Sequence, residues 1–226
     1  MTLIVRKSVR AALATLAAAA LFATAPTGQA RNGIGDIVSV EQDWELVVGT
    51  PDIDRCSPQV FILGYPESGG DFWTEFLINY ADQPSFSAGG VQIQVWEGSS
   101  VLDGADNSPH QSVLQSANET VTFTLAMQVA SNNLRFQAKN VSSTSFGNVG
   151  NLVSNASYDE DNLNKYSTAD TMQNSGILCG SSRVVSLTLK QVRKYDAAGN
   201  VAVEPAQILY PLPTKLTTNG TLTGSN

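Results

Sequence analysis

The sequence contains few of the residues on which most catalytic and metal sites depend. Among its 226 residues there is one histidine, His110, and there are two cysteines. His110 lies in the segment NSPHQS and no nucleophile-elbow motif occurs, so the sequence does not predict a Ser-His-Asp triad. Two cysteines and one distant histidine do not make the tetrahedral ligand set of a zinc site. Glycine-rich phosphate-binding loops are absent as well.

Basic residues are scarce, and three of the 13 lie in a leader that we expect to be removed, residues 1–30. The leader has a positive start at Arg6, Lys7 and Arg10 and an alanine-rich apolar run over 11–25. This run is shorter than the roughly 20 residues that span a bilayer, and small residues suited to cleavage follow it. These features predict a signal peptide typical of a bacterial exported protein. The expected location is outside the cytoplasm: extracellular, periplasmic or at the cell surface.

The mature chain is expected to be strongly acidic. Removal of the leader leaves 10 basic against 20 acidic residues, a formal charge of −10 on roughly 196 residues. Binding of nucleic acid phosphates needs a basic patch, so no nucleic-acid partner is predicted. Adhesion to anionic membranes is disfavoured for the same reason. Since no second hydrophobic segment follows the leader, no membrane insertion is expected after cleavage.

The two cysteines, Cys56 and Cys179, both belong to the mature chain. An exported chain meets an oxidising environment, and an even number of cysteines favours pairing. A disulfide closing a loop of this span stabilises the fold by roughly 4–5 kcal/mol in the chain-entropy model. The alternative is two free, buried thiols.

Short strands separated by turn clusters make up most of the mature chain. Residues 121–129 alternate apolar and polar side chains, turn at 131–133, and continue the alternation over 134–138. A long strand is predicted over 183–195, and only 158–171 has a weakly helical composition. About eight to ten such strands with almost no helix predict an all-β fold, a two-sheet antiparallel β-sandwich.

This pattern also predicts the layout of the chain. No fixed-period repeat occurs, and a sandwich of this length forms one domain. The stretch 98–109 is expected to be a long loop. We assign 31–43 to a lead-in that could contain a short strand at 37–40, 44–213 to the sandwich domain and 214–226 to a disordered tail.

The most informative stretch is 71–96, which holds two of the three tryptophans and is predicted to form two strands joined by a loop. Side chains of a strand alternate between its two faces. If the more apolar face is buried, the other face presents Trp73, Glu75, Asn79, Gln92, Gln94 and Trp96. Two aromatic rings among amides and a carboxylate suit a polar ligand with apolar patches, such as a sugar. In the alternative reading Trp73 and Leu77 fill a second buried layer.

The order of these elements resembles the concanavalin A-like jelly roll of lectins, glucanases and laminin-G-type modules. The resemblance covers most of 44–196 and is carried by FWTEFLINY, GVQIQVW, ETVTFTLAMQV with ASNNLRFQAKN, and SLTLKQVRKY. It implies a jelly-roll sandwich and a carbohydrate-related function. The acidic strand of the glucanases, with carboxylates at every second residue, has no counterpart here. The calcium-site pattern of the lectins is not matched either, so no family site residue is transferred.

Acidic residues offer two further hypotheses. Glycoside hydrolysis needs two carboxylates about 5–10 Å apart. Glu75 is the candidate for one, but Glu97 falls on the opposite face by parity. Calcium is the one cofactor that the sequence suggests, because Asp103, Asp106 and Asn107 share one stretch and supply the oxygen ligands that calcium prefers. The alternative is that these are turn residues.

Three functions remain open from the sequence. The first is a non-enzymatic exported β-sandwich that binds a glycan or another cell-surface polymer. The second is a jelly-roll glycoside hydrolase or lyase. The third is a structural or assembly subunit of an extracellular layer, which the low charged fraction of 15% also suits. The oligomeric state is not predicted.

Overall fold

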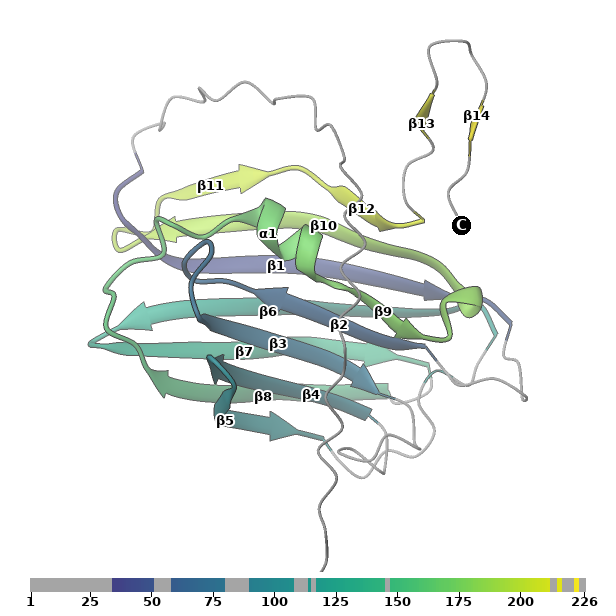
Figure 1. Cartoon of the computed structure of the whole chain (residues 1–226), viewed down its shortest axis with the longest axis horizontal. Coiled ribbons are helices and arrows are strands. Elements are labelled where there is room, and N and C mark those ends of the chain that lie inside the picture. The colour runs from purple at the N-terminus through teal and green to yellow at the C-terminus, as the bar shows by residue number, and fades with distance from the viewer. Residues whose placement is uncertain are drawn as a thin grey trace, which may run out of the picture. The chain divides into compact units, whose positions relative to one another are not determined.

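The computed structural model describes residues 34–50, 58–79, 90–107, 114, 117–144, 147–211, 215–216 and 222–223. The leader, Cys56 and His110 lie outside these ranges. The described residues of 34–211 form two antiparallel β-sheets packed face to face, so the predicted all-β sandwich is confirmed (Figure 1). No helix among the described residues is long and apolar enough to cross a membrane.

The larger sheet has seven strands in the order β11-β10-β1-β6-β7-β8, with β12 also paired to β10. Its strands are β1 (Ile37–Val48), β6 (Glu119–Ala130), β7 (Asn133–Ser143), β8 (Gly147–Ser157), β10 (Val184–Asp196), β11 (Val201–Glu204) and β12 (Gln207–Tyr210).

The smaller sheet has five strands in the order β5-β4-β3-β2-β9. They are β2 (Gln59–Gly64), β3 (Phe72–Asn79), β4 (Gly90–Glu97), β5 (Ser100–Asp106) and β9 (Gly176–Cys179). The remaining elements are helix α1 (Thr168–Asn174), the 3-10 turn η1 (Ser181–Arg183), and the short pair β13 (Lys215–Leu216) and β14 (Leu222–Thr223).

The hydrophobic core lies between the two sheets and is built by alternation along the strands. The inward side chains of β3 and β4 meet those of β1, β6 and β7. Phe76 of β3 packs on Phe123 of β6 at 4.4 Å between ring centroids, and Phe123 also stacks near Trp44 of β1. All three side chains are buried. Burial of this apolar surface drives the association of the sheets, because neither sheet alone can remove it from water.

The hairpin between β6 and β7 is confirmed. Ser131 and Asn132, the two residues between these strands, both have positive φ, at 52° and 58°. Two such residues give the hairpin the twist that matches its strands, and asparagine tolerates this conformation.

Three element predictions were wrong. β1 begins at Ile37 and has 12 residues, so the predicted lead-in 31–43 contains more than half of a central strand. The predicted loop 98–109 contains β5, which pairs with β4 from Gln92 to Glu97. β8 was not predicted, and it pairs with β7 although Gly147 and Gly150 both have positive φ. In each case backbone pairing with a neighbouring strand outweighs an unfavourable local composition.

Asp196 ties the end of β10 to the beginning of the described chain. Its carboxylate accepts hydrogen bonds from the backbone N–H groups of Gly35, Ala198 and Asn200 and from the Asn200 side-chain amide, at 2.8–3.0 Å. The Asn200 amide, followed by the Gly35 N–H, lowers the pKa of Asp196 from 3.8 to about 2. Each donor stabilises the charged form of the carboxyl group.

We therefore expect Asp196 to contribute to acid stability. Its folded pKa lies below its unfolded value, so its contribution is complete above about pH 4 and is lost as the pH falls towards 2. Asp196→Asn should be less stable than wild type in urea at neutral pH and should lose less stability between pH 4 and 2. Asp71→Asn, at an exposed position, is the control. Equal pH profiles for wild type and Asp196→Asn would contradict this role.

Candidate functional site

The outer surface of the five-stranded sheet brings together most of the predicted ligand-binding residues. Along β2, β3 and β4, buried side chains alternate with half-buried ones that point away from the seven-stranded sheet. We call this surface the aromatic face. Its members are Phe61, Leu63, Trp73, Glu75, Leu77, Gln92, Gln94 and Trp96.

Strand register arranges the aromatic face in rows. Trp73 lies opposite Trp96, Glu75 opposite Gln94, and Leu77 opposite Gln92. Five of the six predicted residues therefore share one face and occupy adjacent positions on two paired strands. The sixth, Asn79, is in β3, and its side chain is not among the described parts of the structure. Trp73 and Leu77 are half-buried on this outer surface, so they do not belong to the core between the sheets.

The two tryptophan rings are stacked on each other. Their centroids are 5.8 Å apart and their planes differ by 6°. This offset parallel arrangement is favourable for aromatic pairs. Each ring therefore has one face in contact with its partner and one face directed away from it.

Polar contacts hold Trp96 in place. Its indole Nε1–H donates to Gln94 Oε1 at 3.1 Å and also hydrogen-bonds the Glu75 carboxylate. These contacts orient the ring relative to the amide and the acid beside it. The aromatic face is thus a prearranged set of rings and hydrogen-bonding groups, which reduces the entropy lost on binding.

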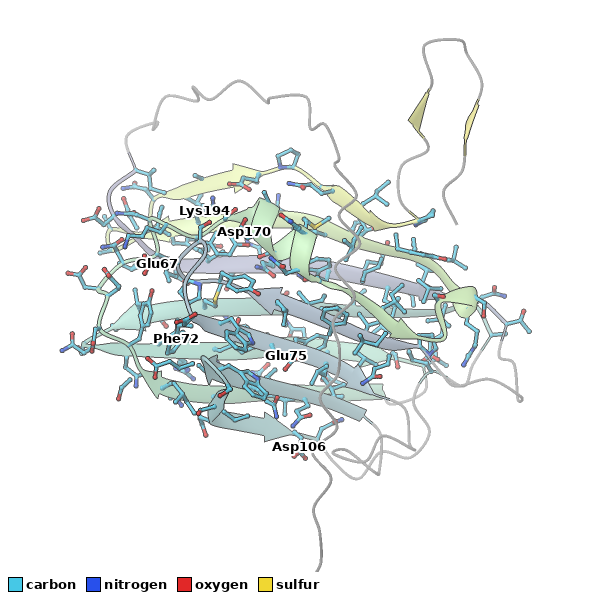
Figure 2. The ribbon with its side chains drawn as sticks, in the orientation of Figure 1. Glu67, Phe72, Glu75, Asp106, Asp170 and Lys194 are labelled. Carbon is cyan, nitrogen blue, oxygen red and sulfur yellow. The ribbon has the colours of Figure 1, made fainter. Side chains whose placement is uncertain are left out.

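Glu75 lies near the middle of the five-stranded sheet (Figure 2). Burial raises the pKa of its carboxyl group, and the hydrogen bond from Trp96 partly opposes that shift. Tyr65, directly after β2, has its pKa raised by burial, then by the negative charges of Asp170 and Glu75. Tyr65 continues the two-residue period of Phe61 and Leu63, so it extends the aromatic face just beyond the end of β2.

Sequence reasoning missed the contribution of β2. Phe61 and Leu63 follow the same two-residue period as the rest of the face. Their position becomes visible only from the register, in which Phe61 lies opposite Leu77 and Leu63 opposite Glu75. The alternation in 59–65 was a usable signal, but the pairing of β2 with β3 was not known.

Among the described strand residues, no second carboxylate is a register neighbour of Glu75. Glu97 pairs with Phe72, and Asp103 bonds to the other sheet, so both face away from Glu75. Asp106 lies at the lower edge of the sheet, two strands from Glu75 (Figure 2). From strand spacing and rise, the Cα atoms of Glu75 and Asp106 are about 12 Å apart. The described residues thus give the hydrolase alternative no adjacent carboxylate pair.

The predicted calcium ligands are not assembled into one site. Asp103, Asp106 and Asn107 lie on or just after β5, and residues three apart in a strand are about 10 Å apart and on opposite faces. The Asp103 carboxylate accepts from Asn155 N at 2.7 Å and Ser154 Oγ at 3.0 Å, which joins β5 to β8. Asn107 Oδ1 accepts from Val91 N. Within the described part of the chain, no group of three or more His, Cys, Asp and Glu could hold a metal ion.

Comparison with known proteins does not assign a family. No family model and no curated protein matches the chain. One solved structure with similarity is SCP-B, a member of the eqolisin family of peptidases, in a complex with the tripeptide Ala-Ile-His. The identity is 10%, the TM-score is 0.31, and the match covers 77% of this chain and 82% of the other. The concanavalin A-like resemblance therefore stays a prediction.

Proposed function

We propose that this protein is an exported, non-enzymatic β-sandwich that binds a glycan through the aromatic face. The observation that carries the proposal is the stacked pair Trp73 and Trp96, held by hydrogen bonds beside Glu75 and Gln94. The leader-like residues 1–30 support export. A disulfide between Cys56 and Cys179 is part of the same proposal, because export exposes cysteines to an oxidising environment.

The chemistry of the face suits a sugar. Aromatic rings attract the C–H surfaces of a pyranose. In this protein the ring faces of Trp73 and Trp96 that are directed away from each other would make that contact. The amides of Gln92 and Gln94 both donate and accept hydrogen bonds, as sugar hydroxyls do. Gly104 of β5 lies opposite Gln94 and has no side chain to cover this row. Ligand specificity would come from the polar groups and much of the affinity from the rings.

Replacement of the rings tests the proposal. Trp73→Ala and Trp96→Ala should each weaken glycan binding about two- to tenfold, which corresponds to the roughly 0.5–1.5 kcal/mol that a stacking ring contributes. The double variant should abolish binding on a glycan array of the mature protein. Each variant should remain folded, since neither ring belongs to the core between the sheets.

Val203→Ala is a suitable control, because this residue is exposed on β11 of the other sheet. Glycan binding that survives in the folded double variant would contradict the proposal. Unfolding of the single variants would show that the rings are structural.

The assembly-subunit alternative also has an observation in its favour. The edge of the seven-stranded sheet carries exposed aliphatic side chains on β11 and β12, namely Val201, Val203 and Ile208, at 50–58% exposure. Edge strands with exposed apolar residues are prone to pair with another chain. A folded protein that binds no glycan and self-associates with rising concentration would favour this alternative over glycan binding.

A further inference from the structure

The charges of the described residues are divided unevenly between the two sheets. The five strands of the smaller sheet contain no lysine, arginine or histidine, whereas they contain Glu75, Glu97, Asp103 and Asp106. The larger sheet holds paired charges on its strands. These ion pairs are Lys139 with Glu41, Arg193 with Glu41 and Asp43, Lys190 with Glu45, and Lys194 with Glu204.

Glu75 has no basic partner among the described residues. Its described polar partner is the indole N–H of Trp96, a neutral group. It is half-buried between β2 and β4, where Leu63 and Gln94 are its neighbours. A partly buried carboxylate without a counter-ion is costly, and a bound cation would remove that cost.

The rings around Glu75 strengthen the same preference. Trp73 and Trp96 form the neighbouring row, and Tyr65 follows β2 in the outward period of Phe61 and Leu63. The faces of aromatic rings are electron-rich and attract organic cations. Among tryptophan, tyrosine and phenylalanine, tryptophan attracts them most strongly. A carboxylate among such rings therefore combines two independent attractions for an ammonium group.

We propose that the aromatic face selects glycans that carry a protonated amine, such as oligomers of glucosamine, with Glu75 as the counter-ion of the ammonium group. This inference rests on the proposed function and names its ligand class. The ammonium N–H groups donate charge-assisted hydrogen bonds to the Glu75 carboxylate. The sugar ring lies against Trp73 or Trp96, and its hydroxyls bond Gln92 or Gln94. Uronic acid and sulfated glycans are disfavoured, because no basic side chain of the described sheet would meet their charge.

The test compares two ligands that differ only at the amine. Glucosamine oligomers and N-acetylglucosamine oligomers of equal length are titrated into the mature protein by calorimetry at neutral pH. The wild-type protein should bind the amine form about tenfold more tightly, because acetylation removes the charge that Glu75 and the rings attract. Raising the salt concentration should reduce this preference.

Two variants of equal charge assign the effect to Glu75. Glu75→Gln should lower the affinity for the amine oligomer about tenfold and remove most of the preference. Glu97→Gln, on the exposed end of β4 and the opposite face, should keep the preference. Choline is a second test ligand. Its quaternary ammonium group can contact the ring faces, but it has no N–H to donate to the Glu75 carboxylate.

The outcomes separate this inference from the proposed function. Equal affinity for both oligomers, or a preference that survives in Glu75→Gln, would overturn the amine selectivity while glycan binding stands. Choline binding as tight as that of the glucosamine oligomer would show a general cation site and overturn the amino-sugar assignment. A folded protein that binds neither oligomer, while other neutral glycans bind on the array, overturns only the inference. Absence of all glycan binding removes both proposals.

Discussion

Replacing Phe76 with alanine is expected to lower the free energy of unfolding by about 3–5 kcal/mol, which would be the largest effect of any single substitution proposed here. Phe76 is fully buried and packs on Phe123 at 4.4 Å between ring centroids. It lies at the centre of the interface between β3 and β6, where a truncated side chain leaves a cavity that the packed sheets cannot fill. Urea denaturation monitored by circular dichroism measures the change.

Trp73→Ala provides the matched comparison on the same strand. Trp73 is larger than Phe76 but lies on the outer surface, so its loss should cost only about 1–2 kcal/mol, mostly the stacking with Trp96. The two variants should thus separate stability from binding: Phe76→Ala destabilises the fold, and Trp73→Ala removes glycan affinity. A greater loss of stability in Trp73→Ala than in Phe76→Ala would contradict the assignment of the inner and outer faces.

Removal of the proposed disulfide is expected to lower the free energy of unfolding by about 4–5 kcal/mol. Cys56 lies outside the described residues, so the pairing itself stays a prediction. In the backbone, Cys179 of β9 is the register partner of Gln59 of β2. Cys56 precedes Gln59 by three residues, which span at most about 10 Å. The register of β2 and β9 is thus compatible with the proposed pairing.

Two measurements check the disulfide. Mass spectrometry of the exported protein, unfolded without reductant, should show two cysteines that do not react with a thiol-labelling reagent. Urea unfolding with and without reductant should give the difference in stability, and a Cys56→Ser, Cys179→Ser double variant should match the reduced protein. Labelling of both cysteines in the unreduced protein would show free thiols instead.

The proposed binding residues and the core residues that hold the strands in place lie on opposite faces of the same strands. Inward residues of β3 and β4 are fixed in the core, so the outward residues between them have little freedom to move. A binding surface on such a sheet is more rigid than one on loops, which favours shape-dependent recognition of a semi-rigid ligand such as a sugar chain. The described ion pairs lie elsewhere, so the aromatic face is not needed for electrostatic stability of the fold.

The sequence predicted the sandwich wherever alternation was strong and uninterrupted. Strands β3, β4, β6 and β10 were predicted close to their actual bounds, and β7 was predicted about five residues too short at its end. β1 was shortened in the prediction because residues 31–43 are polar as a group, Gln42 among them. In the folded protein Gln42 is buried, accepts from Trp44 Nε1 at 3.0 Å and donates to the Tyr166 hydroxyl at 2.6 Å. A partner 124 positions away cannot be read from local composition.

By itself, then, the sequence determined the all-β class and which side chains of 71–96 share a face, because strand geometry makes alternate residues point the same way. Only the tertiary structure decided which of these faces is outward, which strand lies beside which, and that β5 is a strand. Those depend on long-range pairing and on the burial of one sheet against the other. The same pairing separated Asp103 from Asp106, and it placed the basic side chains of the described sandwich strands on the sheet opposite the aromatic face.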